Sequence, residues 1–462
     1  MPGDDTLKRL LRKHPRIKNA LRKIYATVNP TPELGESFWK WYTLFKESEG
    51  WSLEQMREYQ LDLLRNLLHE AKSNSRFYRE RLAGIEPVKI TSVDEFSKKV
   101  PTLSKIEFAA NYSDIFSEKD SDEPLQMSQT SGTTGTPLQF YHSAVDDERE
   151  LAAIFHNWNR VGFEPGKSRR VELLGLVQTD RIYEIYPDRN VLRCSILHLK
   201  PEHIREYAEA IRKYGADFMV GYPSAINLLA SSIREESLAF PDFKAIFLAS
   251  EELYDSQLET IAGVFPRARL MAHYGCSERL LLGIWCEHRQ DYHILPHYGL
   301  AETDSETGEI IGTNLINTVN PFIRYRMSDA VLEKSNSPCP DCGRPYVPRF
   351  IRIGGRMCDY IYSNEKGFIP PAVMTYPVRF AKTIRELQIH QSQADVLVLK
   401  YIPIESAKRE EIESEFEEMR IKLAHVVGES MKIETIRVET LPRGRTGKFK
   451  WIVNELNEAV IR

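Results

Sequence analysis

Apolar residues recur along this chain with two periods, and each period predicts a different kind of element. In residues 52–85 they return every three or four positions, and Ser52 stands where a helix would be capped, so this stretch predicts a helix. Between residues 146 and 300, short apolar runs alternate with helical patterns. The runs predict strands at 171–177, 218–220, 245–249 and 270–272, and the patterns predict helices at 201–214 and after Pro223. This alternation indicates an α/β sheet with helices on its faces.

The pattern changes twice in the second half of the chain. Short strands separated by glycine turns occupy residues 298–363 and predict a β-rich subdomain. After a linker near 356–366, a small α+β domain follows, with a strand at 395–401, a helix at 405–424, a strand near 432–438 and a helix at 451–460. We therefore expect an α/β fold in three parts, which are an N-terminal basic helical extension (1–50), a large domain (51–356) and a small domain (357–462).

The extension carries a signal of its own. Apolar residues at helical spacing from Leu7 to Ile24, with lysines and arginines on the other faces, predict a basic amphipathic helix that Pro15 would kink. Such a helix either contacts an anionic membrane peripherally or a partner, or packs on its own domain with a solvated basic side.

Composition limits the class of protein and its partners. Of the 462 residues 42% are hydrophobic and 28% charged, and the net charge is −4, as expected of a globular protein without a general attraction to nucleic acid. No apolar run reaches the length of a membrane span, and no apolar leader follows Met1. We therefore expect a cytoplasmic location.

One stretch, residues 128–138, concentrates glycine and hydroxyl side chains between two strand-like runs. Gly132 and Gly135 allow a ligand to approach the backbone closely. Successive backbone N–H groups together with serine and threonine hydroxyls form an anion site, for which a polyphosphate is the natural guest. The alternative is an ordinary surface turn. Because no Gly-Lys-Ser/Thr follows, this is not a Walker loop, and a lysine for the outer phosphates would have to come from elsewhere.

Two further stretches carry residues suited to a nucleotide. His273 to Glu278 follow a short strand, the place where α/β sheets hold ligands. Glu278 could hold Mg²⁺ and Tyr274 could stack on adenine, but a buried tyrosine and a helix-starting glutamate are equally plausible. In residues 324–329, Asp329 could accept hydrogen bonds from ribose hydroxyls, while the arginines there could be a structural ion-pair network.

Two glycine-containing stretches lie farther along. Gly354 and Gly355 suit either a hinge or a turn. The segment 441–450 contains Lys448, which could supply the lysine that the phosphate loop lacks or could simply belong to a solvated turn.

The order and separation of these stretches resemble an adenylate-forming enzyme of the acyl-CoA synthetase superfamily, over roughly residues 55–460. Within it, the sequence looks like the phenylacetate–CoA ligase-like branch, which includes capsular-polysaccharide and coenzyme F390 synthetase relatives. The resemblance implies ATP- and Mg²⁺-dependent adenylation of a small-molecule carboxylic acid with release of pyrophosphate. The acyl group then passes to an acceptor, which is coenzyme A or another nucleophile, as the small mobile domain rotates.

Other activities stay open. One is a ligase that forms an amide or ester without coenzyme A, and another is an adenylyltransferase. A third is a relative that binds nucleotide without catalysis. We expect a monomer or a homodimer.

The resemblance also assigns residues. Lys448, Glu278 and Thr133 are implied to be catalytic, with Lys448 contacting the carboxylate and the α-phosphate and Glu278 holding Mg²⁺. Contacts to ATP or AMP are implied for Ser131, Gly132, Thr133, Thr134, Gly135, Ser250, Glu251, His273, Tyr274, Gly275, Cys276, Ser277, Asp329, Arg344, Arg356 and Lys448. The acyl pocket is implied to draw on Phe155, Trp158, Tyr222 and Ala272, and its aromatic residues would suit an aryl acid.

A metal site is expected as well. Cys339 and Cys342 form a Cys-x-x-Cys turn, which in a large cytosolic chain favours a metal or redox site over a disulfide. A structural Zn²⁺ needs two more ligands. Members of the branch pair such a turn with an upstream cluster, which here implies Cys286 and His293, with His288 as the alternative to His293. Free thiols are the other interpretation.

Three features depart from the branch. Cys358 stands at the hinge position, Ser328 replaces the usual glycine before Asp329, and residues 362–367 differ from the Gly-x-Asn segment of relatives. These changes leave adenylation intact and put coenzyme A as the acceptor in question.

Overall fold

The computed structural model describes residues 34–116, 125–129, 138–173, 181–199, 201–317, 319–356, 360–369, 374, 378, 381–443 and 449–456. The predicted N-terminal helix, the glycines and hydroxyls of residues 130–136, Cys358 and Lys448 lie outside these residues. The chain divides into two compact units. The first unit comprises Met1–Glu47, Asp147–Ala249 and Thr260–Met271, and the second comprises Ser48–Asp146, Ser250–Glu259 and Ala272–Arg462.

The first unit contains strands in the order β7-β6-β3-β5-β4, of which only the edge strand β4 is antiparallel to its neighbour. These strands are β3 (Arg170–Leu173), β4 (Tyr183–Tyr186), β5 (Val191–Cys194), β6 (Phe218–Gly221) and β7 (Ala245–Ala249). Every residue of β6 and β7 is buried, as expected of parallel strands covered on both faces. Their largely apolar sequences therefore predicted them well, and the α/β fold is confirmed.

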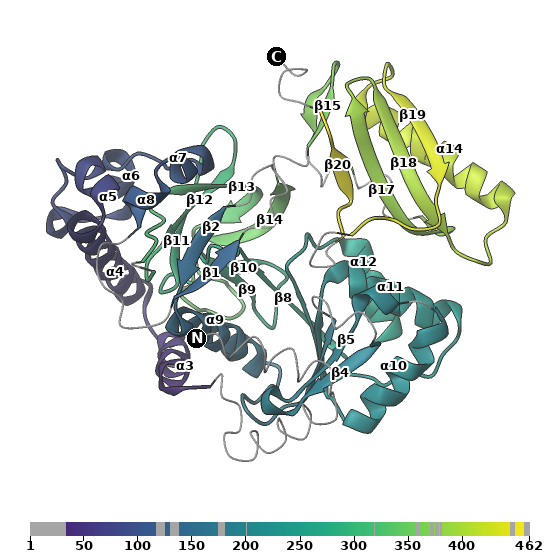
Figure 1. Ribbon diagram of the computed structural model, residues 1–462, viewed down its shortest axis with the longest axis horizontal. Helices are drawn as coiled ribbons and strands as arrows, with labels where there is room; N and C mark the ends of the chain where they lie inside the picture. Colours follow the sequence, from purple (N-terminus) through teal and green to yellow (C-terminus); the bar gives the residue numbers. More distant parts are fainter. Residues whose placement is uncertain are drawn as a thin grey trace, which may run out of the picture. The chain divides into compact units, whose positions relative to one another are not determined.

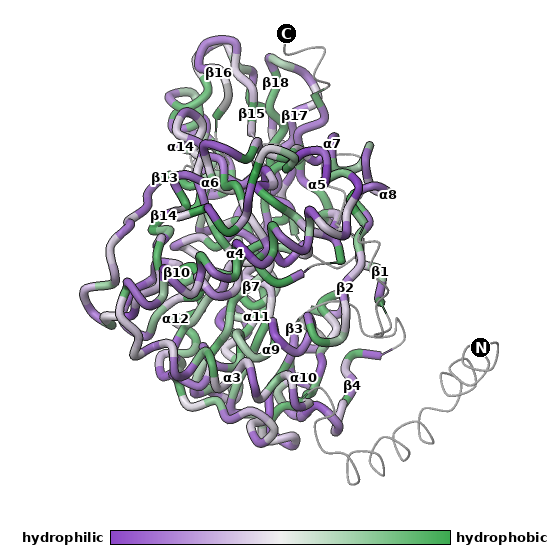
Figure 2. Tube along the Cα trace, turned by 90° about the vertical axis from the view of Figure 1, so that its left-hand side faces the viewer, coloured by the Kyte–Doolittle hydropathy of each residue, from purple (hydrophilic) through white to green (hydrophobic). Residues whose placement is uncertain are grey.

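Helices α10 (Pro201–Tyr214) and α11 (Pro223–Glu235) lie beside this sheet (Figure 1). Helices α3 (Glu36–Ser48), α9 (Ala144–Asn159) and α12 (Asp255–Val264) and the 3₁₀ turns η2 (Pro187–Arg189) and η3 (Ile196–His198) complete this part. Helix α11 and strand β7 stand out as hydrophobic in Figure 2. No described helix combines the length and apolar character needed to cross a bilayer.

The second unit contains antiparallel strands in the order β11-β12-β13-β14-β10-β9-β8, which confirms the β-rich prediction. They are β8 (Arg269–Gly275), β9 (Leu282–Trp285), β10 (Tyr292–Ile294), β11 (Gly299–Thr303), β12 (Glu309–Asn314), β13 (Tyr325–Ser335) and β14 (Arg349–Arg356). A separate hairpin pairs β1 (Gln126–Gln129) with β2 (Gln139–His142) and flanks the predicted phosphate loop.

The helices of the second unit are α4 (Leu53–Asn74), α5 (Arg76–Arg81), α6 (Val93–Lys99), α7 (Lys105–Ala110) and α8 (Tyr112–Ile115), with the 3₁₀ turn η1 (Pro87–Lys89). The single helix predicted at 52–85 is instead two helices, α4 and α5, which are interrupted at Ser75 and end at Arg81. Ser75 adopts an extended conformation, ends α4, and caps α5 by accepting the Tyr78 N–H. Ser52 caps α4 as expected, in a capping box with Gln55.

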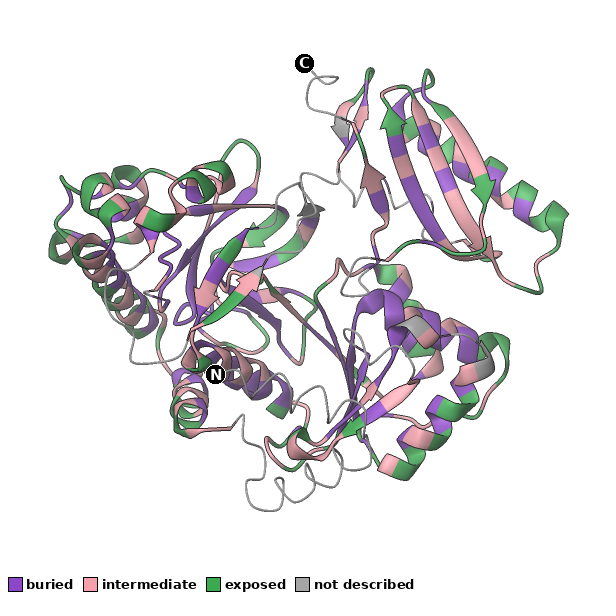
Figure 3. Cartoon of the chain, in the orientation of Figure 1, coloured by how far each residue is buried: buried purple, intermediate pink, exposed green. Residues whose placement is uncertain are grey.

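The C-terminal part has its own hydrophobic core, which begins at Ile361 and includes Leu397, Leu399, Phe416 and Ile452. Its elements are β15 (Ile361–Ser363), β16 (Gly367–Ile369), β17 (Ile384–Gln393), β18 (Val396–Pro403), α14 (Arg409–Val427), β19 (Lys432–Arg437) and β20 (Ile452–Asn454). Figure 3 marks the buried residues along β17 and β18, the central strands of the order β19-β18-β17-β20.

Two predictions fail in this part. The helix expected at 451–460 is instead the strand β20, as far as the described residues reach, because the β-branched Ile452 and Val453 pair in parallel with Ile389 and His390. The linker expected at 356–366 overlaps β15, since Ile361 is fully buried in the C-terminal core.

Candidate functional site

Tyr274 and Asp329 form the clearest contact among the predicted nucleotide residues. Tyr274 lies near the end of β8 and Asp329 within β13, and the Tyr274 hydroxyl donates a hydrogen bond to Asp329 Oδ2 at 2.5 Å. Asp329 is 9% exposed, and Arg356 lies opposite it in the β13–β14 register. The fold therefore brings together an aromatic ring, a carboxylate and an arginine position that the sequence holds far apart.

A tight turn follows β8 and carries Glu278. The Arg279 N–H donates to the Cys276 carbonyl at 3.0 Å, and the Leu280 N–H donates to Cys276 Sγ at 3.4 Å. Because Ser277 and Glu278 lie in a turn, the alternative of a helix-starting glutamate is wrong. Glu278 is half-buried, and its charge adds to burial in raising the pKa of Tyr325 on β13. The carboxylate is therefore near Tyr325, which lies on the strand that also carries Asp329.

His273 precedes this pair and has an unusual environment. Burial lowers the pKa of its imidazole to about 4, and Nδ1 has no hydrogen-bond partner among the described residues. The ring is therefore neutral near pH 7, and its Nδ1 is a buried nitrogen with no hydrogen-bond partner in the described residues.

The turn at Ser250 and Glu251 meets the segment that leads to Lys448. Glu251 Oε1 accepts the Phe449 N–H at 2.7 Å. Arg443 and Phe449, which flank residues 444–448 in the sequence, pair as an antiparallel bridge. The residue next to the predicted catalytic lysine is thereby held at a predicted nucleotide turn, although Lys448 itself lies outside the described residues.

Three non-glycine residues beside these acidic side chains adopt left-handed backbone conformations. Ser250 has a φ of 71°, Arg279 of 56° and Ser328 of 61°, and they adjoin Glu251, Glu278 and Asp329 respectively. Such conformations cost on the order of 1–2 kcal/mol and often mark functional sites. The geometry at Ser328 also explains why a glycine stands there in the motif that this segment resembles.

The arginines of residues 324–329 are structural, as the alternative interpretation held. Arg324 holds Glu302 through two hydrogen bonds of 3.0 and 3.1 Å and donates to the Ser97 carbonyl at 2.6 Å. Arg326 binds Glu309 at 2.7 Å through Nε and Asp304 at 3.2 Å. Both guanidinium groups are therefore engaged within the fold, and Asp329 is the member of this stretch that fits a ligand.

The predicted metal ligands Cys286, His293, Cys339 and Cys342 come together. One ligand atom from each lies within 4.8 Å of all the others. Cys286, His293 and Cys339 are buried, with His293 at 0% exposed, whereas the His288 side chain is 51% exposed. The structure thus favours His293 over His288.

A polar network that sequence reasoning missed orients His293. His293 Nδ1 faces Cys342 Sγ at 3.8 Å, and Nε2 lies 3.3 Å from Asp291 Oδ1. Asp291 in turn pairs with Arg349, which donates from Nε to the Ser337 carbonyl at 3.0 Å. Metal-binding histidines usually have such a carboxylate behind them, and its position two residues before His293 was the available signal.

Arg344 requires a correction, because it lies beside this cluster and not with the nucleotide residues. Its guanidinium holds Glu287 through two bonds of 2.8 Å and Glu49 at 2.9 Å. Glu287 follows the end of β9 that is remote from Gly275, since β8 and β9 run antiparallel with Gly275 opposite Leu282. Arg344 therefore stabilises the Cys/His cluster region.

The residues predicted for the acyl pocket are buried. Phe155, Trp158 and Tyr222 are 2%, 4% and 5% exposed within the first unit, and Ala272 is 3% exposed in β8. Trp158 stacks on Phe247 with ring centroids 4.2 Å apart. These aromatic side chains contribute to the core of the first unit, and a role toward an acid stays a prediction.

The fold is that of adenylate-forming ligases. The chain superposes with a TM-score of 0.66 on the crystal structure of 2-hydroxyisobutyryl-CoA ligase in the postadenylation state in complex with R3-HIB-AMP. The two sequences are 20% identical, and the match covers 87% of this chain and 90% of that one. The predicted fold class is thereby confirmed.

Sequence comparison makes the relationship more specific. Residues 361–455 match the family model of the CapK C-terminal domain. The chain is 24% identical to Protein CapK of Staphylococcus aureus, over 83% of this chain and 86% of that protein. It is also 24% identical to the phenylacetate-coenzyme A ligase of Pseudomonas putida, over 75% and 81%. The resemblance to the phenylacetate–CoA ligase-like branch is confirmed.

Proposed function

We propose that this chain is an AMP-forming acid ligase, which adenylates a carboxylic acid with ATP, releases pyrophosphate and transfers the acyl group to an acceptor. The observation that carries the proposal is the 2.5 Å contact between Tyr274 and Asp329, because it unites the aromatic and acidic residues that a nucleoside requires. The similarity to phenylacetate-coenzyme A ligases supports the reaction class.

The proposed reaction assigns a task to each part of the site. A carboxylate oxygen attacks the α-phosphorus of ATP, the bond from that phosphorus to the bridging oxygen breaks, and pyrophosphate leaves. Catalysis of such a step rests on positioning and charge neutralisation. Asp329 accepts the ribose hydroxyls, Tyr274 stacks on adenine, and the loop at 131–135 holds the outer phosphates. Lys448 neutralises charge on the carboxylate and the α-phosphate, and Thr133 donates to a phosphate oxygen.

Glu278 is proposed to hold Mg²⁺. A half-buried carboxylate such as Glu278 has the hard oxygen donors that this cation prefers. When bound there, Mg²⁺ would neutralise charge on the phosphates.

The proposal includes two candidate classes of acceptor for the acyl group. Coenzyme A is the acceptor that the ligase relatives name. An amine or hydroxyl acceptor is the second candidate, because the C-terminal part matches the CapK domain model and Ser328 departs from the ligase motif. The match to the CapK domain model lies within the small domain, whose rotation we propose brings the acceptor to the acyl-adenylate.

We also propose a structural Zn²⁺ at Cys286, His293, Cys339 and Cys342. A thiolate about 2.3 Å and an imidazole nitrogen about 2.1 Å from a tetrahedral zinc lie about 3.6 Å apart, which is close to the 3.8 Å between Cys342 Sγ and His293 Nδ1. Three thiols and one imidazole fill all four positions, so the metal would stabilise the fold and take no part in the reaction.

Pyrophosphate release from ATP, measured across a panel of carboxylic acids that includes phenylacetate, tests the activity. Wild-type protein should release pyrophosphate with at least one acid, and Lys448→Ala should be slower by about a hundredfold or more. Lys422→Ala, on exposed α14, is the matched control and should match the wild type. Release that does not depend on any acid, or that survives Lys448→Ala, would contradict the proposal.

A further inference from the structure

Three asparagines lie at intervals of three residues, and we call them the asparagine ladder: Asn314 is the last residue of β12, and Asn317 and Asn320 lie between β12 and β13. Their exposed fractions are 0%, 3% and 0%. Asparagine is seldom buried so completely, because its amide then needs partners for both its donor and its acceptor. The proposed reaction gives these side chains no role.

Asn314 joins the ladder to the Glu278 turn. Its Oδ1 accepts the N–H groups of Ile316 and Asn317 at 2.9 and 2.8 Å. Its Nδ2 donates to the Arg279 carbonyl at 2.6 Å. Arg279 is the left-handed residue directly after Glu278, so this bond fixes the conformation that presents the carboxylate.

Asn317 and Asn320 join the ladder to the hairpin of the phosphate loop. Asn320 Oδ1 accepts the Tyr141 N–H at 2.5 Å, and Asn317 Nδ2 donates to the Tyr141 carbonyl at 3.4 Å. The remaining groups bond within the ladder, since Asn317 Oδ1 accepts the N–H groups of Val319 and Asn320. Both main-chain groups of one residue on β2 are therefore held by side-chain amides.

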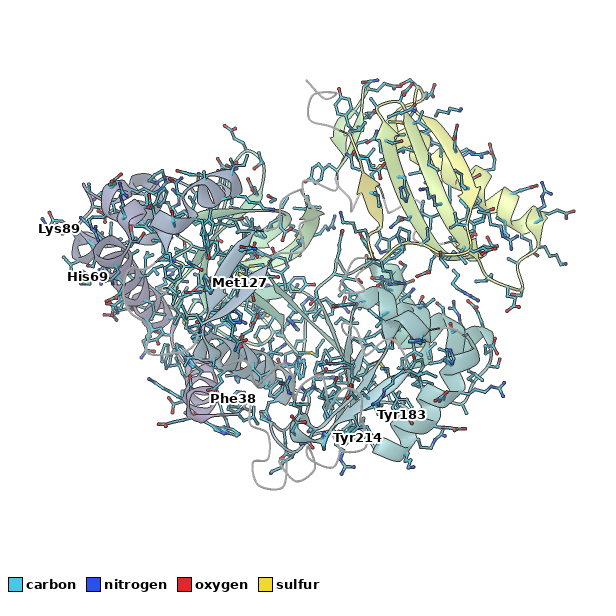
Figure 4. All side chains as sticks on the ribbon, in the orientation of Figure 1. Phe38, His69, Lys89, Met127, Tyr183 and Tyr214 are labelled. Atoms are coloured by element: carbon cyan, nitrogen blue, oxygen red, sulfur yellow. The ribbon has the colours of Figure 1, made fainter. Side chains whose placement is uncertain are left out.

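The hairpin has little other support on that edge. Strands β1 and β2 form a sheet of two strands, so the outer edge of β2 has no third strand in the described part of the chain. On β1, Met127 is 60% exposed and marks the hairpin in Figure 4. Phe140 anchors β2 against Phe322 with ring centroids 6.0 Å apart. The amides of Asn320 and Asn317 form the hydrogen bonds to Tyr141 that a neighbouring strand would otherwise form.

We infer that the asparagine ladder is a positioning device that holds the phosphate-loop hairpin and the Glu278 turn at a fixed distance from each other. This inference rests on the proposed function, in which the loop binds the outer phosphates and Glu278 binds Mg²⁺. A side-chain amide offers an acceptor and a donor on two separate atoms, so an apolar residue of similar size could fill the space but could not bridge the two segments.

The test replaces each asparagine by aspartate, which keeps the size and the acceptor and loses the donor. Binding of ATP with Mg²⁺, and of AMP, is measured by calorimetry. In Asn317→Asp a carboxylate would face the Tyr141 carbonyl, so ATP affinity should fall about tenfold or more while AMP affinity stays within about twofold. Asn320→Asp keeps its bond to the Tyr141 N–H and should lose less ATP affinity than Asn317→Asp. Asn314→Asp should raise the Mg²⁺ concentration for half-maximal ATP binding about fivefold or more.

Controls separate positioning from stability. Asn159→Asp, on α9 of the first unit, loses a comparable bond of 3.0 Å to the Phe163 carbonyl and should leave every affinity unchanged. Asn317→Ala and Asn320→Ala repeat the comparison without a buried charge, and the Tm of each variant is recorded.

The possible results distinguish the inference from the proposed function. Equal losses of ATP and AMP affinity, or a lower Tm with unchanged affinities, would overturn the inference alone. Failure of both Asn317 variants to fold would show a structural role and overturn it as well. Wild-type protein that binds no ATP would overturn the proposed function, and the inference with it.

Discussion

Replacing Cys339 by serine should abolish tight zinc binding while leaving the antiparallel strands of the second unit assembled. Cys339 is 1% exposed, so water cannot readily take the place of the lost thiolate. The other three ligands, Cys286, His293 and Cys342, would remain within 4.8 Å of one another. A serine hydroxyl is a poor ligand for this metal.

The size of the effect follows from the number of ligands. Structural zinc sites with four ligands bind with about 10–16 kcal/mol, so one of four contributes about 3 kcal/mol. Since 1.4 kcal/mol corresponds to a tenfold change, zinc affinity should fall by about a hundredfold or more.

The assay is competition against a chromophoric chelator, with zinc content measured after dialysis. His293→Ala should behave like Cys339→Ser, whereas His288→Ala should keep full zinc content, because the His288 side chain is 51% exposed. Cys194→Ser, a buried thiol outside the cluster, is the control. Loss of zinc in His288→Ala with retention in His293→Ala would refute the ligand assignment, and full zinc content in Cys339→Ser would refute the site.

Three other substitutions test separate parts of the account. Ser328→Gly should raise the Tm, because it relieves a left-handed conformation worth about 1 kcal/mol, and an unchanged or lower Tm would contradict that reasoning. Arg344→Met should lower the Tm because it removes the guanidinium that binds Glu287 and Glu49. It should leave the calorimetric affinity for ATP unchanged, and weaker ATP binding would restore the nucleotide role. The pKa of His273 is lowered to about 4 in the folded chain, whereas the unfolded chain has an ordinary pKa near 6.5. Because the unfolded chain binds the proton more readily, the stability of the folded chain is lost as pH falls from about 6.5 to 4. The Tm of His273→Gln should therefore fall less than the Tm of the wild type over that pH range. If the two curves of Tm against pH are parallel, burial of His273 does not cause the loss of stability.

Sequence patterns predicted the buried parallel strands and their helices well. Strand β7 and helix α10 have the bounds that periodicity indicated. A strand covered on both faces must be apolar throughout, and α10 is amphipathic, so each has a clear pattern. Hydrophobic patterns in the sequence failed to predict elements whose bounds or type depend on one residue or on a distant strand. Ser75 both ends one helix and caps the next, and β20 forms only because an edge of β17 is available to it. Neither cause is visible in local periodicity.

The sites show the same division. The Cys-x-x-Cys turn indicated two candidate metal ligands from sequence, but the choice of His293 depended on β10, which buries that side chain opposite Arg349. The contact of Tyr274 with Asp329 depends on the strand order of the second unit, so only a resemblance could suggest it from sequence. Arg344 was misplaced because its partners, Glu287 and Glu49, lie far apart in sequence.

The central claim is that a carboxylate attacks the α-phosphorus of ATP at this site, and an isotope measurement tests it directly. An acid that supports pyrophosphate release is labelled with ¹⁸O in both carboxylate oxygens and turned over with ATP. The AMP is then analysed by mass spectrometry. Transfer of the acyl group by attack at its carbonyl carbon should leave one ¹⁸O in the AMP phosphate. Label in inorganic phosphate with formation of ADP, or AMP without label, would contradict adenylation of the acid.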